Sequence, residues 1–423
     1  MAGHPPRIGR RNALMGSALA GAGWLAGGAG AAQAWPAATP GAPMLEPPLF
    51  VPGARTADLG FAAADARDAD GSLGGARDAA AQATRGLDHL RNTLRTLGQD
   101  LSQVVSLWVL LTDYADLDAV SRVVDQYFPD PQRYPATCYL GVAGLDGDCV
   151  VRLDAVAYAG GDRSPIAAPG IPLARGARTH GVRAGGLYFL SGVDASDVAG
   201  SDPFERLGRQ TTATLDRIDG VLATEGLGLG DIGRTFMFMS DLSVRPAYGT
   251  ARQERYRGIF APDQFPANSG IGVPNLGPGI MLRSVAIAAR GKQYVVSDQV
   301  RVTAGQFSQA VRHGDWLFVA GQDAIDLNFQ VEAVGDLAGQ TTITLQYLHH
   351  IVEAAGASLD DVVKTTVYLV AGQDRTRFAN AYREFFQSRT RGGWLPNGLT
   401  LEVKELVPDI LVEIDAVVYL GPR

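Results

Sequence analysis

Six histidines and two cysteines are the side chains of this chain best suited to metal binding or nucleophilic chemistry. His349 and His350 are adjacent on a predicted helix, so they face apart and do not form a metal-binding pair. His180 and His313 lie near predicted strand starts, from which they could face a cleft. No Ser-His-Asp or Cys-His spacing indicates a nucleophile with its base. We therefore expect no metal site and no cofactor.

A glycine-rich run at residues 226–230 invites comparison with a phosphate-binding loop. No Lys-Ser/Thr pair follows it, and that pair is what a phosphate loop requires. The run is therefore predicted to be a turn at the end of a helix.

The two cysteines, Cys138 and Cys149, are close enough in sequence to suggest a disulfide. A hairpin turn at Asp146-Gly147 would place Cys138 opposite a residue near 155, about six residues and about 20 Å from Cys149. A disulfide cannot span that separation. The sequence predicts two free, packed thiols.

The strongest pattern in the sequence is a triple repeat. Each copy has a Gln-x-Thr triplet, a Gly sixteen residues after the Gln, a Leu three residues later and a Val or Ile three residues after that. The Gln and Gly positions are Gln82, Gln210 and Gln340, then Gly98, Gly226 and Gly356. A period of about 130 residues is much longer than a solenoid unit, so each copy is predicted to be a domain.

The same elements are expected in every copy, in the order β-β-α-β-α-β-β, which indicates an α+β fold with helices on one face of a sheet. Central strands are predicted at 104–111, 232–239 and 362–370. Each copy is expected to close with a strand pair around a turn. The predicted domains are repeat one (48–160), repeat two (176–291) and repeat three (303–423), joined by a linker at 163–174 and a connector at 291–303.

The first 47 residues have the composition of an export signal and a tether. Arg7, Arg10 and Arg11 precede an uncharged Ala/Gly/Leu run, and Ala32-Gln33-Ala34 offers small residues for cleavage. The adjacent Arg10-Arg11 resembles a twin-arginine signal, so residues 1–34 are predicted to direct export to the periplasm or medium. An uncleaved membrane anchor is the alternative. Residues 35–47 are Pro- and Ala-rich and are predicted to be an extended tether.

The composition excludes some partners. The chain has 423 residues, 46% apolar residues and a formal net charge of −7. No basic stripe occurs, so a nucleic-acid partner is not indicated. We expect a small-molecule substrate, no membrane association after signal cleavage and a monomer.

The repeated residues resemble the Rid family (YjgF-like enamine/imine deaminases). The resemblance is carried by the Gln-x-Thr helix, the Gly-x-x-Leu-x-x-Val/Ile step, an aromatic pair and a Pro. Repeat three carries it most fully, with "VAGQ" at 319–322 and "LVEIDAVVYL" at 411–420. The resemblance implies a chorismate-mutase-like fold and, because that family forms homotrimers, an intramolecular pseudo-trimer with ligand clefts between repeats.

The family's substrate clamp is absent from all three repeats. The resemblance implies an Arg two residues after the Pro, where it would bind a substrate carboxylate. Those positions are Thr137, Asn268 and Gly398.

The family's water-positioning Glu, seventeen residues after the Pro, is present only once. By the resemblance, Glu413 is the catalytic acid/base, and Arg152 and Arg283 at the equivalent positions are candidate anion-binding residues. The resemblance also implies substrate contacts from Phe307 and Arg178, which stand where the family has an aromatic cover. Tyr139 and Thr400 lie two residues past the usual Arg position, on the same strand face.

Several functions remain open. The first is an exported Rid-like hydrolase or deaminase acting on an imine, enamine or related C–N bond. The second is a non-catalytic small-molecule-binding or chaperone-like protein. A third is a cyclic-amide hydrolase of the barbiturase kind, which would need a Ser–Lys pair in each repeat; the positions in question are Ser106, Arg234 and Lys364. A chorismatase-like enzyme is a further alternative.

Overall fold

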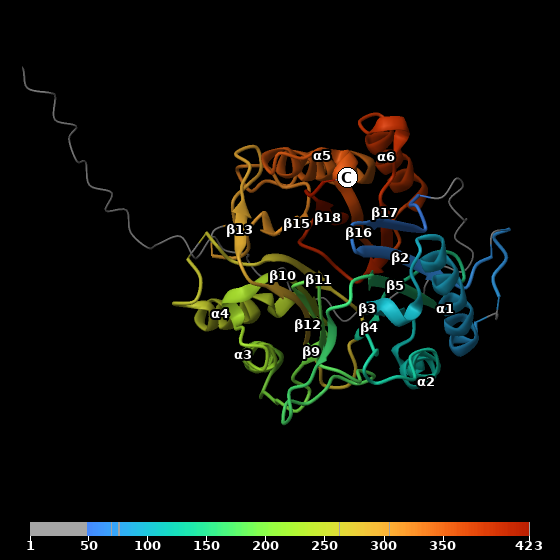
Figure 1. Ribbon diagram of the computed structural model, residues 1–423. Coiled ribbons are helices and arrows are strands. Elements are labelled where there is room, and N and C mark those ends of the chain that lie inside the picture. The colour runs from blue at the N-terminus through green and yellow to red at the C-terminus, as the bar shows by residue number, and fades with distance from the viewer. Residues whose placement is uncertain (1–48, 69, 75–76, 262, 304, 423) are drawn as a thin grey trace, which may run out of the picture. The chain divides into compact units, whose positions relative to one another are not determined.

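The computed structural model describes residues 49–422 apart from 69, 75–76, 262 and 304 (Figure 1). The predicted export signal at 1–34 and the predicted tether at 35–47 lie outside the described residues. The described residues all belong to one unit by their contacts. None of the helices that the structure describes has the length and apolarity needed to cross a bilayer.

Repeat one folds in the predicted order β-β-α-β-α-β-β. Its sheet has the strand order β1-β2-β5-β3-β4, and all pairs are antiparallel except β3 with β4. Its elements are β1 (Gly53–Thr56), β2 (Leu59–Asp65), α1 (Ala79–Thr96), β3 (Val104–Leu111), α2 (Leu117–Tyr127), β4 (Ala136–Gly141) and β5 (Val151–Tyr158).

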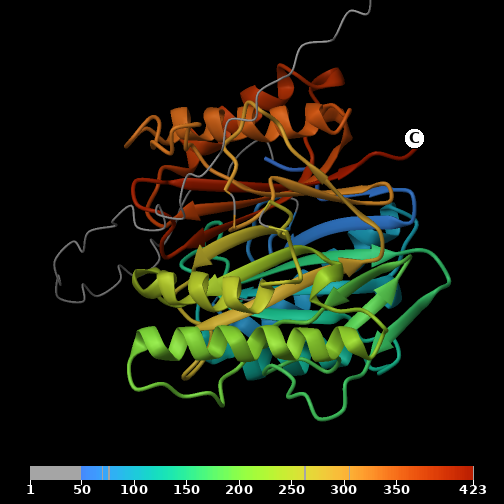
Figure 2. The same cartoon turned by 90° about the vertical axis from the view of Figure 1, so that its left-hand side faces the viewer.

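Repeat two forms a second sheet with the same central pattern, in the order β11-β10-β12-β8-β7-β6, with β9 also paired to β12. Figure 2 shows α3 and α4 running alongside one face of its strands. Its elements are β6 (Arg163–Ile166), β7 (Gly181–Ala184), β8 (Leu187–Leu190), β9 (Val193–Asp194), α3 (Pro203–Ala223), β10 (Ile232–Met239), α4 (Arg245–Tyr256), β11 (Ala267–Gly272) and β12 (Leu282–Ala289).

Repeat three forms the third sheet, in the order β13-β14-β15-β18-β16-β17. Its elements are β13 (Lys292–Val295), β14 (Ala310–His313), β15 (Trp316–Gln322), α5 (Leu337–Ala354), β16 (Val362–Val370), α6 (Arg375–Gln387), β17 (Asn397–Val403) and β18 (Val412–Tyr419). Short 3₁₀ turns lie at Leu101–Gln103, Tyr114–Asp116, Leu229–Asp231, Leu242–Val244, Leu359–Asp361 and Arg391–Gly393.

Four predictions about these elements need correction. The predicted linker at 163–174 begins with β6, and the predicted connector at 291–303 contains β13; each adds an edge strand to the following sheet. α4 ends at Tyr256, earlier than the predicted end at Ile259-Phe260. The last two strands of each repeat do not form a hairpin, because the central strand lies between them.

The two cysteines are unpaired, as predicted, although the hairpin assumed in that prediction does not form. In the sheet, Cys138 and Asp154 are both partners of Trp108, on opposite sides of β3. Cys138 and Cys149 are free and buried, as predicted. Burial raises the pKa of both thiols to about 12.

The repeated Gln and Gly residues each have a local structural function. The Gln side chains are fully buried and accept a backbone N–H just before or at the start of the last strand, from Val150, Met281 and Leu411 respectively. The Gly residues end the first helix with φ of 71°, 68° and 77°, a conformation that favours glycine. The triplet thus fixes the closing strand onto the helix in each repeat.

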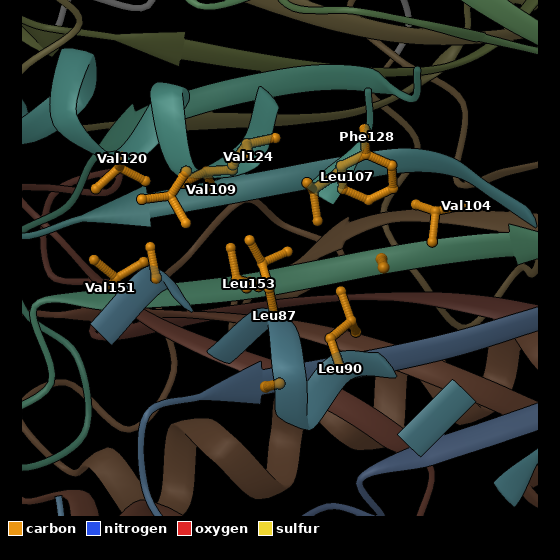
Figure 3. Close-up of a cluster of buried hydrophobic side chains, with 14 of the residues drawn as sticks. Leu87, Leu90, Val104, Leu107, Val109, Val120, Val124, Phe128, Val151 and Leu153 are labelled. Carbon is orange, nitrogen blue, oxygen red and sulfur yellow. The ribbon is translucent and has the colours of Figure 1, made fainter. Parts of the chain in front are cut away.

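Each sheet has two apolar faces. One is covered by its own helices: in Figure 3, Leu87 and Leu90 of α1 and Val124 of α2 lie with Leu107 of β3 and Leu153 of β5. The other face packs against the other two sheets. A single buried cluster combines side chains from all three repeats, including Trp108, Phe238 and Tyr368.

Candidate active site between repeats two and three

The three repeats contact one another pairwise through their sheets, and we name each contact region a seam. At the 1–2 seam, Thr137 O accepts from Gly192 N at 2.9 Å. At the 2–3 seam, Pro266 O accepts from Ser308 N at 3.4 Å. At the 3–1 seam, Pro396 O accepts from Val51 N at 3.3 Å. In each case the penultimate strand of one repeat contacts the following repeat, with repeat one following repeat three.

The position of Glu413 distinguishes the three seams. Its equivalents Arg152 and Arg283 are strand partners of Asp65 and Asp194, respectively. In repeat three, Gln322 is paired with Ile414, so the next step of the same register brings Asp323 opposite Glu413. Two seams therefore have an Arg facing an Asp, whereas the 2–3 seam has two carboxyl groups.

Arg283 is fully committed to protein acceptors. Its five N–H groups donate to Asp194 Oδ2 at 2.6 and 3.0 Å, to Tyr114 Oη and Tyr139 O at 2.6 Å, and to Leu276 O at 3.1 Å. The side chain is 1% exposed. No N–H group of Arg283 is left for the substrate anion that the resemblance implied, and the side chain ties repeat two to repeat one.

Arg152 is also committed. It forms ion pairs with Asp65 at 3.4 Å and with Asp146 at 3.1 Å, and its side chain is largely buried. Asp146 additionally pairs with Arg375 of repeat three, which donates to Glu402 at 2.7 Å. The arginines of the 3–1 seam are thus paired with carboxylates of the protein itself. This arrangement does not favour binding of a substrate anion by Arg152.

Glu413 is buried, and no described residue forms a hydrogen bond with its carboxyl group. Burial, followed by the charges of Asp323 and Asp415, raises the pKa of Glu413 to about 8, against smaller opposing effects of Arg245 and Arg234. A Cβ built on Gly321 would lie 1.8 Å from Oε1 of Glu413 and 2.8 Å from Oγ of Ser269. The Glu413 carboxyl group therefore lies between repeat three and repeat two.

Asp415 supplies part of the negative charge beside Glu413. It accepts hydrogen bonds from Arg234 Nη2 at 2.7 Å, Tyr368 Oη at 2.9 Å and Ser269 Oγ at 3.1 Å. Arg234 and Ser269 belong to repeat two, so this network joins the two repeats beneath Glu413. Asp323 is held separately by an ion pair with Arg301.

Arg245 of repeat two carries a positive charge that acts on Glu413. It is the first residue of α4, only partly buried, and its pKa is lowered by desolvation against the raising effects of Tyr248, Glu413 and Asp323. Among the residues that the structure describes, none forms a hydrogen bond or an ion pair with Arg245. A cation with no partner among the described residues therefore lies within electrostatic range of a carboxyl group whose pKa is raised to about 8.

Two further predicted residues lie at the 2–3 seam. Asn268 is buried, and its Oδ1 accepts from Thr235 Oγ1 at 2.9 Å. Phe307 packs against a small cluster formed by Ala267 of repeat two with Val311 and Ala320 of repeat three. The structure thus brings Glu413, Asn268 and Phe307 to one seam.

The remaining predicted site residues lie at the other seams. Thr137 is buried in β4 beside Ser191, and Tyr139 is 1% exposed within the core of repeat one. Arg178 is half exposed and pairs with Asp125 of repeat one at 2.7 Å. Thr400 is buried in β17, at the 3–1 seam. These four residues do not join Glu413 in one site.

Sequence reasoning missed Arg245 and Asp323. A signal for Arg245 was present, because Arg245 and Arg375 hold the same position in repeats two and three, at the start of the second helix. Asp323 directly follows the "VAGQ" segment and has acidic equivalents in Asp65 and Asp194. Neither signal says that the side chain crosses a seam.

The residues considered for a Ser–Lys pair in the cyclic-amide hydrolase alternative lie in a cavity away from Glu413. Ser106, Arg234 and Lys364 line one small cavity of about 60 Å³ between the sheets, here called the inner cavity. Lys364 pairs there with Asp154 of repeat one rather than with Ser106, and Arg234 pairs with Asp415. No Ser–Lys pair forms among the described residues of this cavity, so it does not favour ring-opening chemistry.

His313 lines a cavity described below, whereas His180 is held by the backbone of its own repeat. His180 is held by Ala168 N at 3.2 Å and Ile171 O at 2.9 Å, so it does not face a substrate cleft. His349 and His350 lie beside Glu353 on α5. Within the described part of the chain, no group of three or more His, Cys, Asp or Glu residues is arranged to hold a metal ion.

Comparisons with known proteins identify the fold's family. Residues 60–159 and 298–420, just over half of the chain, match the model of the family described as Endoribonuclease L-PSP. A RutC family protein of Pyrococcus horikoshii is 37% identical over 128 residues, which are 30% of this chain and 98% of that protein. The 2-iminobutanoate/2-iminopropanoate deaminase of Mus musculus is 28% identical over 131 residues, 31% of this chain and 93% of that protein.

A solved chorismatase structure is similar over a larger share of the chain. It covers 75% of this chain and 93% of its own, with 18% sequence identity and a TM-score of 0.49. The family model leaves out the segment between residues 159 and 298, which is most of repeat two. With its two matched segments, the chain belongs to the Endoribonuclease L-PSP family, the Rid or YjgF-like family that its repeats resemble.

Proposed function

We propose that the chain is a hydrolase of the imine deaminase type, acting at the 2–3 seam on a small imine or enamine that carries an anionic group. The observation that carries the proposal is a buried Glu413 with a raised pKa and no hydrogen-bond partner among the described residues, within electrostatic range of Arg245 of repeat two. Of the three equivalent positions, only that of Glu413 holds an acid, while Arg152 and Arg283 are held in ion pairs.

The chemistry follows from the two groups. Arg245 binds the substrate's anionic group by charge-assisted hydrogen bonds. Glu413, protonated at neutral pH, donates its proton to the imine nitrogen or, in an enamine, to carbon. The resulting carboxylate then takes a proton from the water that attacks the electrophilic carbon. The C=N bond is replaced by C=O, and the nitrogen leaves as ammonia.

The relatives support this reaction class. The mouse protein named as a 2-iminobutanoate/2-iminopropanoate deaminase aligns along most of its length with one third of this chain. Since the position two residues after the Pro holds Thr137, Asn268 and Gly398, the anionic group is bound from a different direction, by Arg245 on α4. The carboxylate of a 2-iminoacid is therefore expected to approach Glu413 from the side of α4 rather than from the strand that follows the Pro.

We also propose that the three repeats form an intramolecular pseudo-trimer, that the protein is a monomer and that it is exported. The closed series of contacts from repeat one to two, two to three and three to one supports the first point. Arg10-Arg11 and the apolar run that follows support export. Tethering raises the effective concentration of each repeat at its neighbours and allows each seam to differ.

Ammonia release tests the proposal. 2-Iminopropanoate is formed in situ from alanine by an added amino-acid oxidase, and wild type is compared with Glu413→Gln and Arg245→Gln. We expect Glu413→Gln to lower kcat by about 10²–10⁴-fold, as for loss of a general acid/base. Arg245→Gln is expected to raise KM by about tenfold or more, with partial rescue by Arg245→Lys.

Glu353→Gln provides the matched control, because Glu353 lies in the same repeat with its side chain 53% exposed. It should retain wild-type rates. Equal rates for wild type and Glu413→Gln would reject catalysis at this seam. If 2-iminopropanoate binds with no turnover by any variant, the seam is a binding site, and the protein is then the non-catalytic module considered as the alternative.

A further inference from the structure

A second, larger cavity lies where the hairpin turns of the three repeats meet, away from Glu413. It has a volume of about 380 Å³, within the range of small-molecule sites. We call it the outer cavity. Turn and strand residues of all three repeats line it, among them Tyr158, Leu187, His313 and Trp316.

Three equivalent residues form the boundary between the two cavities. Leu59, Leu187 and Trp316 hold the same position in the second strand of the sheet in repeats one, two and three, and each lines both the inner and the outer cavity. The outer cavity therefore has an apolar floor, contributed equally by the three repeats and enlarged on one side by an indole ring.

Aromatic rings form the walls. The Trp316 and Tyr419 rings lie 5.0 Å apart at 51°, so they form an angled pair. Tyr158 holds the position in repeat one that Tyr419 holds in repeat three. Gly185, with φ of 59°, leaves room for Tyr158, because a Cβ there would lie 2.8 Å from its ring. Trp and Tyr faces attract cations through the negative charge above the ring.

The charged side chains in the lining of the outer cavity are Asp58, Asp315 and Arg290. Asp58 and Asp315 lie at equivalent turns, and no described residue pairs with the Asp58 carboxylate, while Asp315 is 3.8 Å from Arg312 on the surface. The one guanidinium in the lining, Arg290, donates to the carbonyl groups of Glu225 and Gly226. Burial lowers the pKa of His313 to about 4, so its ring is neutral at pH 7.

We propose that the outer cavity binds a small organic cation, a substituted ammonium ion with an apolar or aromatic body. The body packs on Leu59, Leu187 and Trp316, and the charged nitrogen lies against the aromatic walls and the carboxylates of Asp58 and Asp315. A ligand with a negative head group is disfavoured by the same two carboxylates. This site is independent of the reaction at the 2–3 seam.

Calorimetric titration of the full-length protein tests the site with three ligands of similar size. Benzyltrimethylammonium is the cationic probe, benzyl alcohol the neutral analogue and phenylacetate the anionic analogue. We expect one benzyltrimethylammonium to bind per chain, more tightly than benzyl alcohol, and phenylacetate not to bind. Raising the salt concentration to about 0.5 M should weaken the cation, because exposed carboxylates are screened.

Two variants locate the probe. Trp316→Leu installs the residue found at the equivalent positions of repeats one and two, so it preserves the floor while removing the indole. We expect it to weaken binding by about three- to tenfold. Asp58→Asn with Asp315→Asn should weaken binding by about tenfold or more. Glu353→Gln, which removes a distant surface carboxylate, should leave binding unchanged.

Two results with the wild-type protein and one with the variants would overturn the proposal. Equal affinity for phenylacetate and benzyltrimethylammonium, or no binding of the cation at millimolar concentration, would reject it. So would cation binding that survives all three substitutions in variants whose melting temperature matches wild type. Proton NMR of the bound probe gives a second measurement, since aromatic walls should shift its methyl signal upfield and a site elsewhere on the surface should not.

Discussion

Lys364 and Asp154 lie 210 residues apart in the chain and form an ion pair whose side chains are 8% and 7% exposed. The equivalent pair at the 2–3 seam is Arg234 with Asp415. At the 1–2 seam the same two positions hold Ser106 and Val285. Two seams thus carry a buried ion pair around the inner cavity, and one is neutral.

The uncharged residues Ser106 and Val285 of the 1–2 seam suggest a control for removing the ion pair between Lys364 and Asp154. Asp154→Val leaves the Lys364 ammonium buried without a partner, and we expect it to lower the free energy of unfolding by about 3–5 kcal/mol. Adding Lys364→Ser copies the residues of the 1–2 seam and should recover most of that loss. Urea denaturation followed by circular dichroism measures both. A single variant as stable as wild type would show that the pair is not needed.

Glu413 should make the protein's stability depend on pH. Its pKa is about 8 in the fold and near 4.5 in an unfolded chain, so between these values the folded state holds a proton that the unfolded state has released. Stability from this group is therefore lost as pH rises from 4.5 to 8. Glu413→Gln removes the effect, and its melting temperature should exceed that of wild type more at pH 9 than at pH 5.

Asp323→Asn should alter the pH dependence of the reaction. Because protonated Glu413 is the proton donor, kcat/KM is expected to fall as pH rises through about 8. Removing the Asp323 charge lowers the pKa of Glu413, and the alkaline limb should move down by about one unit. Asp326→Asn, in the exposed loop beyond, is the control. An unchanged or upward-shifted limb would contradict Glu413 as the titrating group.

Arg283 and Arg178 should respond differently to the same substitution. Arg283→Lys removes most of five buried hydrogen bonds, and we expect it to destabilise the fold by about 3 kcal/mol or more. Arg178→Lys affects a half-exposed pair with Asp125 and should change stability by less than about 1 kcal/mol. Similar losses in both, measured by urea denaturation, would contradict the assignment of Arg283 as a structural tie.

Export can be measured directly. Changing Arg10→Lys and Arg11→Lys together should prevent twin-arginine export and retain the protein in the cytoplasm. Cell fractionation followed by immunoblotting compares this variant with Arg7→Lys, which leaves the adjacent pair intact. Equal export of the double variant would exclude the twin-arginine route.

The repeat register predicted much of the fold. The central strands at 104–111, 232–239 and 362–370 match β3, β10 and β16, because buried strands have continuous apolar runs. The edge strands β6 and β13 were missed because they are short, half-exposed and rich in polar or Pro residues. The false hairpin arose because strands consecutive in sequence were assumed to pair, whereas a parallel partner was available in β3.

The site was harder to predict than the fold. Glu413 followed from its position in the register, as did the contrast with Arg152 and Arg283. That the two arginines are held in ion pairs depends on Asp65 and Asp194, whose position opposite them only strand pairing reveals. Arg245 belongs to a different repeat from Glu413, and no spacing within one repeat encodes a charge that acts across a seam.

Gly321 offers a practical rule for sorting tandem sequences of this type. Any larger residue at 321 would occupy the place of Oε1 of Glu413, so a glycine there and a glutamate at 413 must occur together for the acid to keep its position. A related sequence with the glutamate but a bulkier residue in place of Gly321 is therefore a poor candidate for acid/base catalysis by that glutamate. The residues at positions 321 and 413 are therefore more informative together than either position alone.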